Sequence, residues 1–184
     1  ADQLYAPPAA PFAPFALATS DVPIASIVIP VYDQFAHTLA CLRALAAHPP
    51  AVAFETIVVD DGSNDETVSA LPQIAGVRYH RRAHNGGFIA ACNDGASLAR
   101  GEVLVFLNND TIPQPGWLDA LLATFAEHPD AGLVGAQLLY PDGRLQEAGD
   151  QGDDRTGADI DDDRQSEHRR QQRQPPTGGE HGQH

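Results

Sequence analysis

Carboxylate and amide side chains gather at three places where short apolar runs end. Tyr32 and Asp33 come after the run 25–30. Asp60 ends the run 56–60, and Asp61 follows it. An Asn-Asn-Asp triplet at 108–110 comes after the run 103–107. A carboxylate at such a position can accept hydrogen bonds from a nucleobase or from ribose hydroxyls. Oxygen ligands suit Mg²⁺ or Mn²⁺ bridging a diphosphate. The alternative for each motif alone is structural, namely a turn and helix cap at Asp60–Asp61 and a polar strand exit at 108–110.

A fourth motif, Gly86–Gly87, precedes a predicted helix. Glycine lets a backbone approach a ligand closely, and the N-terminus of a helix favours anions. The alternative is an ordinary tight turn from strand to helix. The motif lacks the G-x-G-x-x-G pattern and does not follow the first strand, which argues against a dinucleotide-binding Rossmann domain.

The elements that position these motifs alternate regularly. Apolar runs predict strands at 25–30, 56–60, 77–80, 103–107 and 133–140, and helical spacing predicts helices at 35–45, up to 69, 86–98 and 117–125. Such alternation predicts an α/β fold with a mostly parallel sheet flanked by helices. The run 103–107 is the most hydrophobic and is expected at the centre of the sheet, with 77–80 near an edge. Ligands of such sheets bind at the carboxyl ends of the strands, where the polar motifs lie.

Composition divides the 184 residues into three parts. Residues 1–24 are rich in Ala and Pro and predict a linker or an arm lying on the domain. Residues 25–149 form the predicted domain. Residues 150–184 contain only Ala158 and Ile160 as aliphatic residues, which predicts a disordered polar tail. The net charge of −14 argues against a nucleic-acid partner, which needs a basic surface.

Two further observations concern the cellular setting. Cys41 and Cys92 sit at apolar positions of predicted helices without the spacing of a metal site or disulfide framework. We therefore expect a reduced, cytoplasmic environment, which includes a peripheral position at the inner face of the membrane. No apolar run approaches the length of about 18 residues that a transmembrane segment requires.

The order of the motifs closely resembles glycosyltransferase family 2, whose members have the Rossmann-like GT-A fold. The resemblance covers roughly residues 24–149. It rests on Ile29-Pro30-Val31-Tyr32, Val58-Val59-Asp60-Asp61-Gly62-Ser63, Asn85-Gly86-Gly87 with Ala91 and Asn93-Asp94-Gly95, Gly101-Glu102, and Phe106-Leu107-Asn108-Asn109-Asp110. By this resemblance the nucleotide-binding residues are Pro30, Val31, Tyr32, Asp60, Asp61, Asn85, Gly86 and Asn109. The triplet corresponds to the metal-binding DxD motif of the family, which makes Asp110 and Asn108 the metal ligands.

The sequence departs from the family pattern in two ways. Only Asp110 of the triplet keeps a carboxylate, so we expect the divalent cation, Mg²⁺ or Mn²⁺, to bind weakly. The acceptor-binding half and its catalytic base do not follow residue 149, and the catalytic residue stays unknown. The abrupt change of composition suggests an incomplete domain, with a shifted reading frame or an artificial terminus as the hypothesis.

The resemblance implies inverting transfer of a sugar from a UDP-, dTDP- or GDP-linked donor to a glycan or lipid-linked acceptor, as in polysaccharide biosynthesis of the cell envelope. The alternative is a truncated, catalytically inert nucleotide-binding module, which the absence of a catalytic acid beyond residue 149 favours for this chain. A nucleotidyltransferase is a third possible function. It would place a Gly/Arg/Lys-rich loop after the first strand, where Tyr-Asp-Gln-Phe stands at 32–35.

Overall fold

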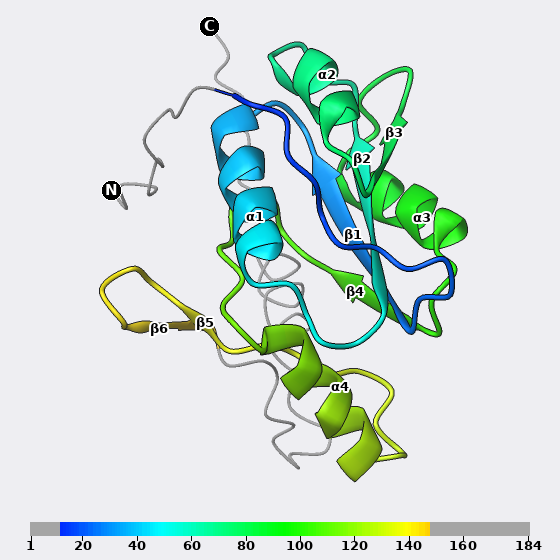
Figure 1. Ribbon diagram of the computed structural model, residues 1–184, viewed down its shortest axis with the longest axis vertical. Coiled ribbons are helices and arrows are strands. Elements are labelled where there is room, and N and C mark those ends of the chain that lie inside the picture. Colours follow the sequence, from blue (N-terminus) through cyan, green and yellow to red (C-terminus); the bar gives the residue numbers. More distant parts are fainter. Residues whose placement is uncertain (1–11, 148–184) are drawn as a thin grey trace, which may run out of the picture. The chain divides into compact units, whose positions relative to one another are not determined.

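The computed structural model describes residues 12–147. Their core is a four-stranded parallel sheet with the order β3-β2-β1-β4 (Figure 1). The strands are β1 (Ala25–Val31), β2 (Phe54–Asp60), β3 (Val77–Arg81) and β4 (Val103–Phe106), and the helices are α1 (Phe35–Ala47), α2 (Thr67–Ala70), α3 (Phe88–Leu98) and α4 (Trp117–Glu127), with a short 3₁₀ helix at Leu71–Gln73. The predicted mostly parallel α/β sheet with flanking helices is confirmed.

Alternate residues of the two central strands face opposite layers of helix. Ile27 and Ile29 pack with Leu42 of α1, whereas Val28 packs with Ala91 of α3. Every residue of β1 and β2 is buried, which explains why both strands are rich in apolar residues. Helix α3 lies so close to the sheet that a Cβ added at Gly95 would stand 2.3 Å from a Val28 methyl carbon. The two helices therefore fix the sheet from both sides (Figure 1).

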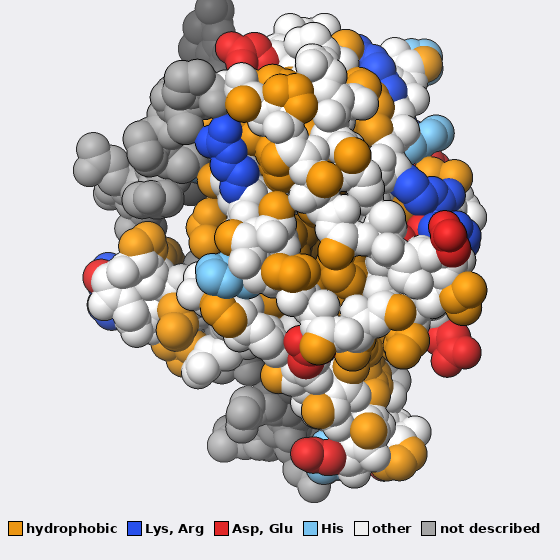
Figure 2. All heavy atoms as spheres, viewed as in Figure 1, with side chains coloured by type: hydrophobic (Ala, Val, Ile, Leu, Met, Phe, Trp, Pro, Cys, Tyr) orange, Lys and Arg blue, Asp and Glu red, His pale blue; other side chains and the backbone are white. Residues whose placement is uncertain are grey.

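The predicted central position of the fourth strand is wrong for the described residues. β4 pairs with β1 and lies at the edge of the sheet. Val105 faces the buried core, but Leu104 and Phe106 on the other face are 42% and 51% exposed. Helix α3 covers this face over β1 and β2 and not over β4, so Leu104 and Phe106 stay exposed. Figure 2 shows that hydrophobic side chains also reach the surface on the face drawn there.

The predicted strand at 133–140 is also wrong. Only β5 (Leu138–Leu139) forms within it, and this strand pairs antiparallel with β6 (Leu145–Glu147) in a separate two-stranded sheet. The turn between them is closed by a 2.8 Å hydrogen bond from Tyr140 N to Arg144 O and contains Gly143 at φ +83°. The run 133–140 thus ends in a hairpin instead of extending the parallel sheet.

Residues 12–24 form an arm that packs on the domain. Leu17 N donates to Ala75 O at 2.9 Å, and Ala75 N donates to Phe15 O at 3.1 Å. Leu17 is buried, and the Phe12 ring meets the Phe35 ring edge-on at 5.8 Å between centroids. The disorder predicted for 150–184, and residues 1–11, lie outside the described residues.

A buried ionic cluster ties the starts of the central strands to the end of α3. Glu55 is fully buried in β2 and accepts hydrogen bonds from Ser26 Oγ at 2.7 Å and from Arg100 N at 2.8 Å. Arg78 and the Arg100 side chain form ion pairs with its other oxygen at 2.6 and 2.9 Å. Burial alone would raise the pKa of Glu55, but these hydrogen bonds lower it to about 2. The cluster lies at the end of the sheet away from the polar motifs.

Both cysteines are free and buried, as their positions in the sequence predict. Burial raises the pKa of the Cys41 thiol to about 12 and also raises that of Cys92. Neither thiol is therefore a reactive group at neutral pH. Among residues 12–147, no helix has the length and apolar character needed to span a bilayer.

Candidate functional site

The loop after β1 carries Tyr32 and is held in an uncommon conformation. Asp33 and Gln34 both adopt left-handed backbone angles, with φ of 52° and 57°. Two reciprocal hydrogen bonds support this loop: Asp33 N donates to Ser63 Oγ at 2.7 Å, and Asn64 N donates to Asp33 Oδ1 at 2.7 Å. Non-glycine residues in this region store strain and persist only where neighbours hold them. The loops after β1 and β2 therefore act as one unit that presents Tyr32.

Asp65 fastens two helices to the same unit. Its carboxylate accepts a hydrogen bond from Phe35 N at 2.9 Å and another from Thr67 N at 3.0 Å. Phe35 begins α1 and Thr67 begins α2, so one side chain satisfies a free N–H group at each helix start. The helix cap considered for Asp60–Asp61 is thus supplied by Asp65, whereas Asp60 forms the turn through a hydrogen bond from Ser63 N at 2.8 Å.

Asp60 lies beneath the site and does not line the cavity described below. It is fully buried, and its carboxylate accepts from Ser63 N at 2.8 Å, from Arg81 at 2.7 Å and from the Tyr79 hydroxyl. Burial opposes ionisation, yet the hydrogen bonds from Ser63 and Tyr79 and the charge of Arg81 keep the pKa of Asp60 below its ordinary value. The same contact and burial raise the pKa of Tyr79 to about 12. Asp60 therefore shapes the loop instead of facing a ligand.

Asp61 organises the loop that enters α3. It accepts hydrogen bonds from Gly87 N at 2.7 Å, from Gly86 N at 2.9 Å and from the Arg82 guanidinium, which also contacts Asp94 at 2.7 Å. Burial would raise the pKa of Asp61, but the bonds from Gly86, Arg82 and Gly87 lower it. In Figure 2 arginine and acidic side chains meet over β3 and α3.

This arrangement differs from the anion site expected at Gly86–Gly87. The two N–H groups at the start of α3 are directed at the Asp61 carboxylate, so the anion at this helix N-terminus belongs to the chain itself. Gly87 has φ +87°, a conformation that glycine adopts without strain. Asn85 is exposed and its Oδ1 accepts from Gly87 N at 3.0 Å, which closes the turn. Asn85 and Gly86 border the site but do not line its cavity.

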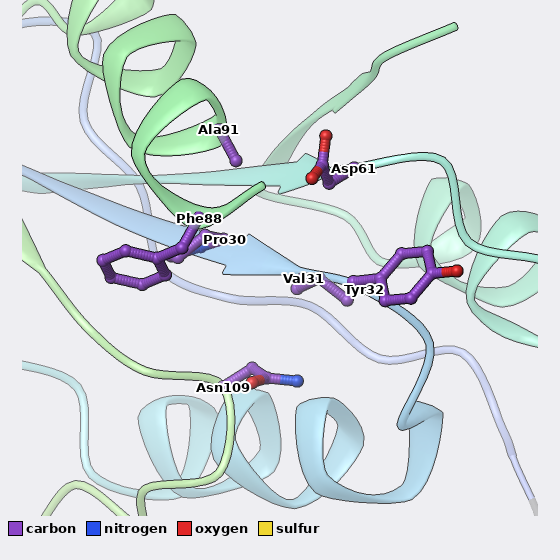
Figure 3. A pocket seen from close by; sticks show the side chains of 7 residues that line it. All are labelled: Pro30, Val31, Tyr32, Asp61, Phe88, Ala91 and Asn109. Carbon is purple, nitrogen blue, oxygen red and sulfur yellow. The ribbon is translucent and has the colours of Figure 1, made fainter. Parts of the chain in front are cut away.

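A cavity of about 210 Å³ opens at the carboxyl ends of β1 and β2 and the loop after β4. Figure 3 shows Pro30 and Val31 between Tyr32 on one side and Phe88 on the other, with Asn109 across from Asp61. The lining residues are Pro30, Val31, Tyr32, Asp61, Phe88, Ala91 and Asn109. The structure thus brings together five of the residues expected at the site. Phe88 was missed from the sequence, where only its place directly after Gly86–Gly87 could have indicated it.

The triplet after β4 divides between the cavity and solvent. Asn109 lines the cavity, whereas Asn108 and Asp110 are exposed beside it. In the part of the chain that the structure describes, no three His, Cys, Asp or Glu side chains form a metal-binding group. One exposed carboxylate with neighbouring amide oxygens fits a Mg²⁺-type ion that takes its remaining ligands from phosphate and water. Asp110 and Asn108 are the residues that would hold it.

In open, mostly parallel α/β sheets, ligands bind in a crevice outside the carboxyl ends of the strands, which is where this cavity lies. The profile of Glycosyl transferase family 2 matches residues 26–181 of this chain. The chain belongs to this family. The match of the profile extends to residue 181, whereas the motifs that resemble the family end near residue 149.

Similar proteins agree with this assignment, and solved structures share the fold. The O-antigen biosynthesis protein RfbC of Myxococcus xanthus is 35% identical over 131 residues, which are 69% of this chain and 10% of RfbC. A mannosyltransferase of Pyrobaculum calidifontis, solved in complex with GDP-Man and Mn²⁺, superposes with a TM-score of 0.53 at 22% identity, covering 68% of this chain and 39% of that one. The structure of S. aureus TarS in complex with UDP-GlcNAc superposes with a TM-score of 0.51 at 24% identity. The match covers 64% of this chain and 38% of the TarS chain. The two structures confirm the GT-A fold. The chain spans less than half the length of each of these proteins.

Proposed function

We propose that the cavity between Tyr32, Phe88 and Asn109 binds the nucleoside diphosphate of a UDP-, dTDP- or GDP-linked sugar. The observation that carries this proposal is the convergence of Pro30, Tyr32, Asp61 and Asn109 from three strand ends on one cavity. The solved GT-A structures with UDP-GlcNAc and with GDP-Man support a nucleotide sugar as the ligand. The family supports sugar transfer as the reaction of the whole protein.

Each side chain has a distinct part in this proposal. Tyr32 is 48% exposed and offers a ring face on which a base can stack, an interaction that contributes about 1–3 kcal/mol. Pro30 and Val31 form an apolar wall beside it. Asp61 fixes the Gly86–Gly87 loop and so holds Phe88 at the cavity. Asp110 and Asn108 would hold a divalent cation, which supplies charge neutralisation for the departing diphosphate.

The wider function that we propose is inverting transfer to a glycan or lipid-linked acceptor in polysaccharide biosynthesis of the cell envelope. RfbC, an O-antigen biosynthesis protein, supports an acceptor of this kind. The protein would act in the cytoplasm or at the inner face of the membrane, where nucleotide sugars are available to it.

Inverting transfer requires a base that deprotonates the acceptor hydroxyl. Asp61 is the single carboxylate among the described residues that line the cavity. Its lowered pKa and its bonds to Arg82, Gly86 and Gly87 make it a weak base. This observation favours the second candidate, in which residues 12–147 bind the nucleotide without catalysing transfer.

A thermal-shift series with UDP, dTDP and GDP, each with and without Mn²⁺, tests the proposal. A ligand at 100 times its dissociation constant stabilises the folded state by about 2.7 kcal/mol. We expect one diphosphate to raise the melting temperature, and Mn²⁺ to increase the shift. Equal melting temperatures in all samples would contradict nucleotide binding. Release of diphosphate from the matching nucleotide sugar then separates the enzyme from the inert module.

A further inference from the structure

Thr38 is a buried polar residue of α1 that faces the loop after β4. It is fully buried, and its Oγ1 accepts a 3.0 Å hydrogen bond from Asn109 Nδ2. Cys41, one turn further along α1, places its Sγ 4.0 Å from the Asn108 carbonyl oxygen. Helix α1 therefore contacts two members of the triplet from the side opposite to solvent.

The Asn109 amide is oriented with its nitrogen end toward the Thr38 hydroxyl, which acts as the acceptor. Since the nitrogen end is held at α1, the oxygen end remains for a ligand in the cavity that Asn109 lines. An amide oxygen accepts hydrogen bonds and cannot donate them. It suits a hydroxyl or N–H donor of the nucleoside and not the acceptor oxygens of a phosphate.

We propose that Thr38 is a positioning residue that presents Asn109 as a hydrogen-bond acceptor for a hydroxyl or N–H donor of the bound nucleoside. The identity of the ligand rests on the function proposed above, whereas the orientation of Asn109 does not. The two parts are therefore measured separately.

The first measurement needs no ligand. The side-chain amide of Asn109, assigned by NMR with the help of Asn109→Leu, should show the slow solvent exchange of a hydrogen-bonded group. Thr38→Val should make this exchange at least several-fold faster, and Thr38→Ser should restore the slow rate because serine keeps the hydroxyl. Thr56→Val is the matched control, since Thr56 is equally buried but its hydroxyl has no hydrogen-bond partner among residues 12–147. Unchanged Asn109 exchange in Thr38→Val would overturn the proposal.

The second measurement compares nucleosides with their diphosphates by calorimetry, using uridine with UDP and guanosine with GDP in the presence of Mn²⁺. For the pair that binds, Asn109→Leu should weaken both members by the same factor, roughly 3- to 10-fold, as expected for one lost hydrogen bond. Thr38→Val should give part of this loss, and Thr38→Ser and Thr56→Val should bind as the wild type does. A loss confined to the diphosphate would show that Asn109 contacts phosphate and would overturn the assignment to the nucleoside. If the wild type binds none of the four, the proposed function fails, while the NMR result still decides the role of Thr38.

Discussion

Asp61 joins the loop after β2 to the start of α3 through Arg82, Gly86 and Gly87. We predict that Asp61→Ala weakens nucleotide binding by about 1–3 kcal/mol, the usual range for hydrogen bonds to a charged group. The reason is that the loop carrying Phe88 loses its anchor. Calorimetry with the diphosphate that binds checks the affinity.

Asp94→Ala is the control for this variant. It removes the outer carboxylate that Arg82 contacts, which is 42% exposed, and leaves the Asp61 bonds in place. Its affinity should stay close to that of the wild type. Equal losses in the two variants would show that the Arg82 ion pairs, and not the bonds from Asp61 to the loop, support binding.

Thr56 is a buried residue of β2 whose hydroxyl has no hydrogen-bond partner within the described part of the chain. Leaving such a group buried costs about 1–3 kcal/mol. We therefore predict that Thr56→Val, which keeps the shape and removes the hydroxyl, raises the free energy of unfolding by about 1 kcal/mol. Urea denaturation measures this change, and a decrease would mean that the Thr56 hydroxyl has a stabilising contact.

At the scale of single residues, the order of the motifs grouped side chains that the structure brings to one cavity, although not every residue named from the sequence reaches it. Pro30, Tyr32 and Asn109 line the cavity as expected. Asp60 and Asp61 are adjacent and chemically alike, yet only Asp61 reaches the cavity. The direction of each depends on partners distant in sequence, such as Tyr79 for Asp60, and motif order carries no information on those partners.

At the scale of elements, Glu55 links β2 to β1 and to the end of α3. Its pKa falls from the usual 4.5 to about 2 in the folded protein. Because the folded pKa is depressed, its stabilisation is fully present above pH 4.5 and is lost as the pH falls toward 2. We predict that Glu55→Gln lowers stability at pH 7 and flattens the dependence on pH across this window.

Chemical denaturation at several pH values measures both effects. Glu102→Gln alters an exposed glutamate directly before β4 and serves as the control. It should leave the profile between pH 4.5 and pH 2 unchanged. A Glu55→Gln profile as steep as that of the wild type would assign the acid sensitivity to other carboxylates.

The helices and the strands β1 to β3 follow from periodicity, because each pattern reflects a local geometry and one buried face. The position of β4 does not follow in this way. A hydrophobic run predicts that a strand is buried between other strands. Leu104 and Phe106 are apolar, yet both are exposed among the described residues. The apolar run 133–140 also predicted a strand of the parallel sheet. The turn at 140–144 instead directs its end into a hairpin.

At the scale of the whole molecule, the chain carries a net charge of −14 while its proposed ligand is an anion. Repulsion of this kind is reduced by a bound divalent cation and by salt. We predict that Mn²⁺ strengthens diphosphate binding and that Asp110→Ala abolishes this gain while leaving nucleoside binding unchanged. Calorimetric titrations of the wild type and the variant check this, and a metal effect that survives in Asp110→Ala would place the cation elsewhere.

The central claim is that one cavity at the ends of β1 and β2 and the loop after β4 receives a nucleoside diphosphate. Mapping of backbone amide NMR shifts during titration with UDP, dTDP and GDP tests it most directly. The account predicts saturable shifts at 31–33, 61, 86–88 and 108–110, with residues around Glu55 at the other end of the sheet unaffected. Shifts centred on another surface, or none with any of the three ligands, would contradict it.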